Sequence, residues 1–137
     1  MTDVKAFRRG CYEAARQTGG ELTDFQVGNE PTPSFHQAII TYSDRNVAVV
    51  CVRDAPLMAL AEPHVLEFLP ARTAGSLTFV DLPELAAALT EVPGFRLLSV
   101  AELGEPVDAA RCPQISQHDL RYWQPQTLGE ALFNYWD

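Results

Sequence analysis

The sequence predicts a single α+β domain with a central, mainly antiparallel sheet, on which N-terminal, middle and C-terminal helices pack. Three observations support this prediction. Runs of β-like composition gather between residues 21 and 80, runs with helical periodicity lie at both ends of the chain, and strict β-α-β alternation is absent. No break in composition divides the chain, so we expect one domain over residues 1–137.

The N-terminal segment predicts a helix over residues 3–18. Phe7 and Cys11 lie on one apolar stripe at helical spacing. Thr2 is a suitable N-cap, and the two glycines at 19–20 supply a left-handed stop. The opposite face carries a local excess of basic residues, which indicates a helix surface in contact with water. These basic residues are Lys5, Arg8, Arg9 and Arg16.

Short β-like runs follow the first helix. A polar turn of four residues at 43–46 joins two of them and predicts an antiparallel hairpin. The run from Val47 to Val52 is apolar at every position, which indicates a central strand covered on both faces. The expected strands cover residues 21–27, 35–42, 47–53, 57–61, 65–69 and 76–80.

A second helix is expected over residues 81–91. Asp81 and Glu84 form a D-x-x-E capping pattern, and Pro83 suits the first helical turn. Beyond this helix we expect a strand over residues 95–100, a short helical turn over 100–105 and a loop over 106–117.

The C-terminal segment combines a second capping pattern with a high density of aromatic side chains. Thr127 and Glu130 predict the start of a final helix over residues 127–136. A segment this apolar has to dock on the sheet or on another molecule. Docking as the last element of the core is the favoured interpretation, and a partner or homodimer surface is the alternative. The aromatic residues are Tyr122, Trp123, Phe133, Tyr135 and Trp136. The predicted core comprises Phe7, Cys11, Ile39, Val49, Cys51, Leu85, Leu89, Leu98 and Trp136.

The chain is acidic, with 18 Asp and Glu against 10 Lys and Arg and a formal charge of −8 at pH 7. This balance argues against binding to nucleic acid or to a membrane surface, since both need a basic patch. The first residues contain no apolar run, and no run approaches the length of a membrane span, so we expect neither a signal peptide nor a membrane helix. The three cysteines lie far apart and form no C-x-x-C pair, which favours an intracellular, cytoplasmic protein.

No motif for a cofactor or a metal is present in the sequence. Its glycines form neither G-x-G-x-x-G nor a Walker loop, and there is no G-x-S-x-G elbow. His64 and Glu67 have the spacing of helical metal ligands, but Pro63 and the strand-like run that follows it argue against a helix there. We therefore expect no cofactor and no metal site.

One group of polar residues supports an alternative interpretation as a small enzyme or ligand-binding domain. Cys112 lies beside Arg111, which favours the thiolate, and His118 follows six residues later as a candidate base. Asp119 and Arg121 complete a catalytic candidate group directly before the aromatic segment, where these side chains would line a pocket.

The favoured interpretation is a non-enzymatic interaction protein. Between residues 81 and 108 six acidic residues occur with a single arginine, which predicts a surface that attracts a basic protein. Small size, acidity and the lack of catalytic motifs make the chain similar in type to small bacterial immunity proteins. We therefore expect an inhibitor or immunity-type partner of a basic protein such as a nuclease, with a homo-oligomer as a further possibility. The expected interaction residues are Glu84, Glu91, Glu102, Glu105, Tyr122 and Trp123.

Overall fold

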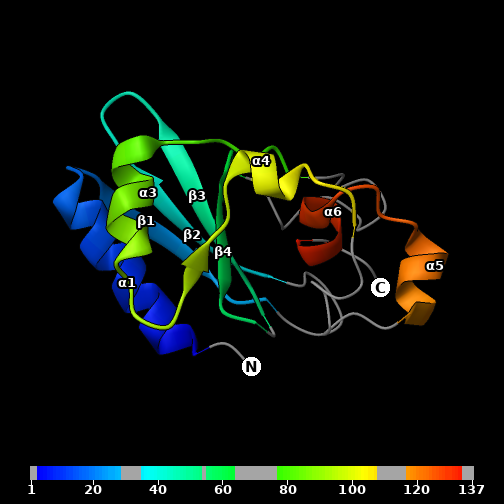
Figure 1. Cartoon of the computed structure of the whole chain (residues 1–137). Helices are drawn as coiled ribbons and strands as arrows, with labels where there is room; N and C mark the ends of the chain where they lie inside the picture. Colours follow the sequence, from blue (N-terminus) through cyan, green and yellow to red (C-terminus); the bar gives the residue numbers. More distant parts are fainter. Residues whose placement is uncertain (1–2, 29–34, 54, 64–76, 108–116, 134–137) are drawn as a thin grey trace.

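A computed structural model of the chain describes residues 3–28, 35–53, 55–63, 77–107 and 117–133 (Figure 1). These residues form a five-stranded sheet with helices packed on both of its faces. The structure therefore confirms the predicted α+β fold with a central, mainly antiparallel sheet.

The strands lie in the sheet in the order in which they occur in the chain. They are β1 (Glu21–Gln26), β2 (Phe35–Thr41), β3 (Asn46–Val52), β4 (Leu57–Ala61) and β5 (Arg96–Leu97). The first four pair with their neighbours in antiparallel orientation, and β5 pairs in parallel with β4. β1 is consequently an edge strand, and β3 is the centre of the sheet.

Within the described residues, two helices pack on each face of the sheet. α1 (Val4–Gln17) and α3 (Pro83–Thr90) lie side by side on one face (Figure 1). α4 (Val100–Leu103) and α6 (Leu128–Leu132) pack on the opposite face. α5 (Gln117–Trp123) lies at the end of the molecule away from α1 (Figure 1).

The side chains of β3 alternate between two hydrophobic cores. The core under α1 and α3 contains Val47, Val49 and Cys51, and the core under α4 and α6 contains Ala48, Val50 and Val52. Since successive side chains of a strand point to opposite faces, an unbroken apolar run fits a strand that is buried on both sides. The prediction for this segment is confirmed.

α1 begins one residue later than predicted. Asp3 is the N-cap in place of Thr2, and its carboxylate accepts a hydrogen bond from the backbone N–H of Ala6 at 3.1 Å. The helix ends at Thr18, and Gly19 then takes a left-handed φ of 80° that few other residues adopt.

The predicted cap of the second helix is wrong. Pro83 is the first residue of α3, which makes Leu82 the N-cap, and no side chain caps this end. Proline favours the first helical position, where its missing N–H costs nothing, so the helix starts too late for Asp81 to cap it. The Asp81 carboxylate instead accepts a hydrogen bond from the N–H of Val100, at 3.2 Å, at the start of α4.

Two predicted strands are shorter in the structure. The segment expected at 76–80 contributes one isolated bridge, between Ala61 and Phe79, because β5 pairs with the other end of β4. The strand expected at 95–100 is the two-residue β5, and the helical turn expected after it is α4. The strand expected at 65–69 lies outside the described residues.

The C-terminal region contains one helix that was not predicted, α5, and a shorter final helix than predicted. Thr127 caps α6 as expected, but Phe133 takes an extended backbone and ends the helix. Most of the loop expected at 106–117 lies outside the described residues. Of the predicted core, Ile39 is only partly buried, Trp136 is not described, and the other seven residues are buried.

Candidate functional site

α1 and α3 pack closely and in antiparallel directions. The end of α1 at Thr18 lies beside the start of α3, while Gly10 faces Val92, just beyond the end of α3. A Cβ atom on Gly10 would lie 2.7 Å from Cγ1 of Val92, so a larger residue here would require Val92 or the helices to shift. The lack of a side chain at this point allows the close approach.

A continuous groove follows the outer seam between these helices. Two adjoining hollows of about 390 and 360 Å³ make up the groove and share Gln17, Ala88 and Glu91. A third hollow, of about 370 Å³, continues the line past Thr18 and Glu84. The first two hollows, termed here the α1–α3 groove, are lined by Gly10, Glu13, Gln17, Glu84, Ala88 and Glu91, among others.

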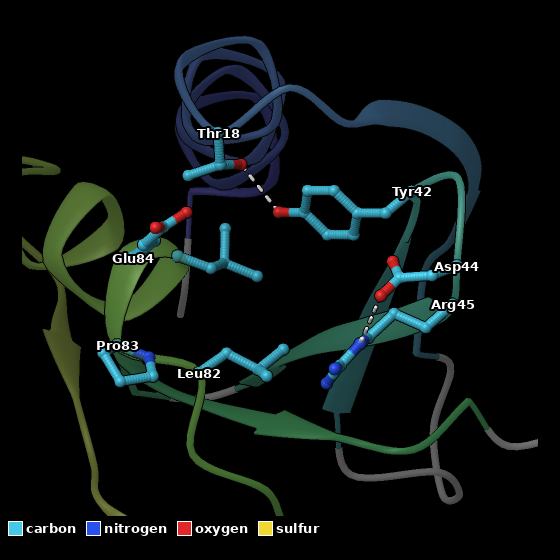
Figure 2. A pocket seen from close by; sticks show the side chains of 8 residues that line it. Thr18, Tyr42, Asp44, Arg45, Leu82, Pro83 and Glu84 are labelled. Carbon is cyan, nitrogen blue, oxygen red and sulfur yellow. Dashed lines mark hydrogen bonds and ion pairs between the residues drawn. The ribbon is translucent and has the colours of Figure 1, made fainter.

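The third hollow, termed here the Tyr42 hollow, lies between the start of α3 and the turn that joins β2 to β3 (Figure 2). Tyr42 and Leu82 supply partly buried apolar walls, and Leu85 reaches into the core beneath. Asp44 and Arg45 stand on the opposite side from Glu84, with an ion pair of 3.9 Å between them. The hollow is therefore largely apolar with charged groups at its rim.

Glu84 and Glu91 are the two acidic residues of the groove that form no ion pair within the described chain. Both are exposed. Glu84 lies in the first turn of α3 and Glu91 is its C-cap residue, seven positions later with a helical backbone, so the two lie on the same face about two helical turns apart. Glu13 across the groove is different, because its carboxylate binds Arg16 at 2.8 Å. Arg9, which likewise forms no ion pair in the described chain, lines the end of the groove that contains Glu91 and adds one positive charge there.

The other predicted acidic residues lie on a different part of the molecule. Glu102 belongs to α4, on the opposite face of the sheet from α3, and its carboxylate binds the Arg96 guanidinium at 2.5 Å. The same carboxylate completes a capping box with Ser99. Glu105 is exposed just after α4. The structure thus brings Glu84 and Glu91 together and separates them from the other two.

Three of the four catalytic candidates, His118, Asp119 and Arg121, lie on α5. Cys112 lies outside the described residues. His118 and Arg121 are exposed on the same helix, where the His118 ring stacks on Tyr122 at 6.3 Å between centroids. None of the three hollows is lined by these residues.

The aromatic interaction candidates also lie on α5. Tyr122 is 70% exposed, and Trp123 is the last residue of the helix. The α1–α3 groove, by contrast, was missed by sequence analysis apart from its two glutamates. The Tyr42 hollow was missed as well, because Thr18, Tyr42 and Leu82 come from three separate segments and no local spacing connects them.

The buried thiol and histidine side chains have structural roles in the core. Cys11 and Cys51 are both buried as predicted, and burial, together with the nearby Cys51, raises the pKa of the Cys11 thiol. A thiol in this environment stays protonated and is a poor nucleophile. The buried His36 accepts a hydrogen bond at Nδ1 from the N–H of Gly28, at 2.9 Å, which indicates a structural role.

Within the described ranges, no three side chains of His, Cys, Asp or Glu gather closely enough to hold a metal ion. Across the same residues, no helix is both long enough and apolar enough to cross a membrane. Comparison of the chain with protein-family models, with curated proteins and with solved structures finds no match.

Proposed function

We propose that this chain is a small acidic interaction protein and that the α1–α3 groove is its docking surface for a basic protein partner. The observation that carries the proposal is the exposed pair Glu84 and Glu91, which lie along the groove without an ion pair in the described structure. An inhibitor or immunity-type partner of a basic enzyme would use such a surface.

Electrostatics supports this assignment. The formal charge of −8 attracts a basic partner over several ångströms of solution and raises the association rate at low salt. At contact, Glu84 and Glu91 are available to the partner's cations, whereas Glu102 is already neutralised by Arg96. The groove is therefore favoured over the surface of α4.

The exposed edge of the sheet is a poorer docking surface. β1 carries an irregularity between Leu22 and Asp24, which interrupts the regular pairing that an added strand requires. The Asp24 carboxylate also accepts a hydrogen bond from the N–H of Phe25, at 2.9 Å. A bulge and a charge at an edge are features that discourage strand addition. The helical layer is therefore favoured over the sheet edge as the docking surface.

We propose that the protein acts in the cytoplasm. Cys11 and Cys51 are buried thiols, and a reducing compartment preserves them in that form. A cytoplasmic interaction protein would meet its basic partner there before that partner acts.

Affinity capture from the source cell tests the proposal with matched charge variants. We expect the wild-type chain to retain a basic protein at about 50 mM salt and to release it at about 500 mM. The double variant Glu84→Gln/Glu91→Gln should fail to retain it. The control Glu21→Gln/Glu62→Gln removes the same charge from exposed sites outside the groove and should behave as wild type.

Two results would contradict the proposed function. One is the absence of any retained protein at low salt. The other is equal retention by the groove variant and the control variant, because that result would show a role for total charge alone.

A further inference from the structure

The shape of the α1–α3 groove suits a rod-like occupant. Its walls are two antiparallel helices, and its line extends from Ala6 to Thr18 along α1. At 1.5 Å per residue this distance is about 18 Å, or roughly three turns of a helix. Ala88 lines it with a small side chain, so a partner backbone can approach closely there.

The spacing of Glu84 and Glu91 along α3 favours a helix over an extended chain as the occupant. Glu84 and Glu91 are about 10.5 Å apart along the axis of α3. Residues on one face of an extended strand recur about every 6.7 Å, so same-face positions give about 6.7 or 13 Å, which matches this spacing less well. A helix presents two side chains seven residues apart on one face at the required 10.5 Å or so.

The Tyr42 hollow adds an apolar position beyond Glu84. Leu82 and Leu85 form its walls with Tyr42, whose hydroxyl is already hydrogen-bonded to that of Thr18. Figure 2 shows the Glu84 side chain beside this hollow, on the side of α3. Asp44 and Arg45 pair with each other at the far rim, so the hollow itself favours an uncharged side chain.

We infer that the groove binds a basic amphipathic α-helix of the partner, which carries two Lys or Arg seven residues apart and one apolar residue a turn beyond them. The two cations face Glu84 and Glu91, and the apolar residue enters the Tyr42 hollow. This inference rests on the proposed function and names the part of the partner that the groove recognises.

Two synthetic helical peptides of identical composition test the inference. The matched peptide has a leucine, a lysine one turn later and a second lysine seven residues after the first. The mismatched peptide carries the second lysine on the opposite face. We expect fluorescence anisotropy to show at least about 10-fold tighter binding of the matched peptide to the wild-type chain. Glu84→Gln/Glu91→Gln should remove this preference, and Glu21→Gln/Glu62→Gln should keep it.

Leu82→Ser tests the apolar anchor. Leu82 lies at the uncapped N-cap of α3, where serine supplies the missing cap while it removes an apolar wall of the hollow. Binding of the matched peptide should weaken about 5-fold or more. A peptide with alanine in place of the leucine should bind the wild type and Leu82→Ser equally, because its methyl group is too small to fill the hollow.

The outcomes separate this inference from the proposed function. If the two peptides bind equally, or if neither binds, the inference of a helical occupant is wrong. The proposed function is still supported in that case if capture of the basic partner depends on Glu84 and Glu91. If capture of the partner does not depend on either glutamate, the proposed function is wrong as well. A dimer in sedimentation that Glu84→Gln/Glu91→Gln dissociates would make a second copy of the chain the occupant and would also overturn the inference.

Discussion

The hydroxyl groups of Thr18 and Tyr42 lie 2.6 Å apart and join the end of α1 to the turn between β2 and β3. Thr18 Oγ1 also lies 2.8 Å from the carbonyl oxygen of Ala14 and donates its single proton there, so Tyr42 is the donor between the hydroxyls. The backbone N–H of Tyr42 donates to the carbonyl oxygen of Arg45 at 2.8 Å. One tyrosine thus fixes both the helix and the turn that border the Tyr42 hollow.

Tyr42→Phe is expected to lower the free energy of unfolding by about 1 kcal/mol, the usual contribution of a hydrogen bond of this kind. Unfolding in urea measures the change. Tyr12→Phe is the control, because Tyr12 is 57% exposed on α1 and should change stability by less than about 0.5 kcal/mol. Equal effects of the two substitutions would show that the bond to Thr18 contributes nothing to stability.

Gly129 is required for the approach of α6 to Phe79. A Cβ atom at this buried position would lie 2.5 Å from Cε2 of Phe79 and 3.3 Å from the carbonyl oxygen of Leu103. Gly129→Ala gains helix propensity but overpacks the core, so we expect a net loss of about 1–3 kcal/mol.

Gly104→Ala is the matched control in thermal unfolding. The nearest atom to a Cβ there is a backbone oxygen at 3.5 Å, which is an ordinary contact. Its melting temperature should stay within a few degrees of wild type. If Gly129→Ala melts no lower than Gly104→Ala, Phe79 moves aside at little cost and the packing argument is wrong.

Local sequence patterns predicted an element correctly where one kind of structure fits the pattern clearly better than the others. The apolar run Val47–Val52 has no polar position to expose, and its short length and four valines favour a strand buried on both faces over a buried helix. The stripe of Phe7 and Cys11 likewise fixes the buried face of α1. These two elements carry most of the core under α1 and α3.

Local sequence patterns could not predict interactions between segments that lie far apart in the chain. Asp81 and Glu84 have the spacing of a cap, but the Asp81 carboxylate binds the N–H of Val100, 19 residues away. The Tyr42 hollow could not be predicted for the same reason, since Thr18, Tyr42 and Leu82 meet only after the sheet has formed. The charge of Glu84 and Glu91 was visible in the sequence, whereas the hollow beside them was not.

Burial of Cys11 predicts a loss of stability at alkaline pH. The pKa of its thiol is raised above the usual 9.0 by burial and by the neighbouring Cys51, so the folded state keeps the proton when the unfolded state loses it. The contribution to stability is complete below about pH 9 and falls above it by about 1.4 kcal/mol per pH unit.

Urea unfolding at about pH 8 and pH 10 measures this effect, with Cys11→Ala as the reference. The wild type should lose about 1.4 kcal/mol more than the variant between these conditions, because the variant has no thiol to titrate at that position. Equal losses would show that Cys11 ionises as readily in the folded protein as in the unfolded chain.

Phe133 is expected to be the most costly side chain to remove from the C-terminal region. It is 2% exposed, with its ring 6.0 Å from that of Phe35 and 5.7 Å from that of Phe79. Phe133→Ala should lower the free energy of unfolding by about 3–5 kcal/mol, a large part of the roughly 5–15 kcal/mol available to a domain. Tyr122→Ala removes an aromatic ring that is 70% exposed and should change it by less than about 0.5 kcal/mol.

Truncation after Gln126 extends the same test to the whole segment. It removes Leu128, Leu132 and Phe133, all of which are buried in the core under α4 and α6. Since each large buried side chain contributes roughly 1.5–3 kcal/mol, the truncated chain should be insoluble or should lack dispersed amide signals in its NMR spectrum. A truncated chain that folds normally and loses only an oligomeric contact or a bound partner would instead identify the segment as an interface.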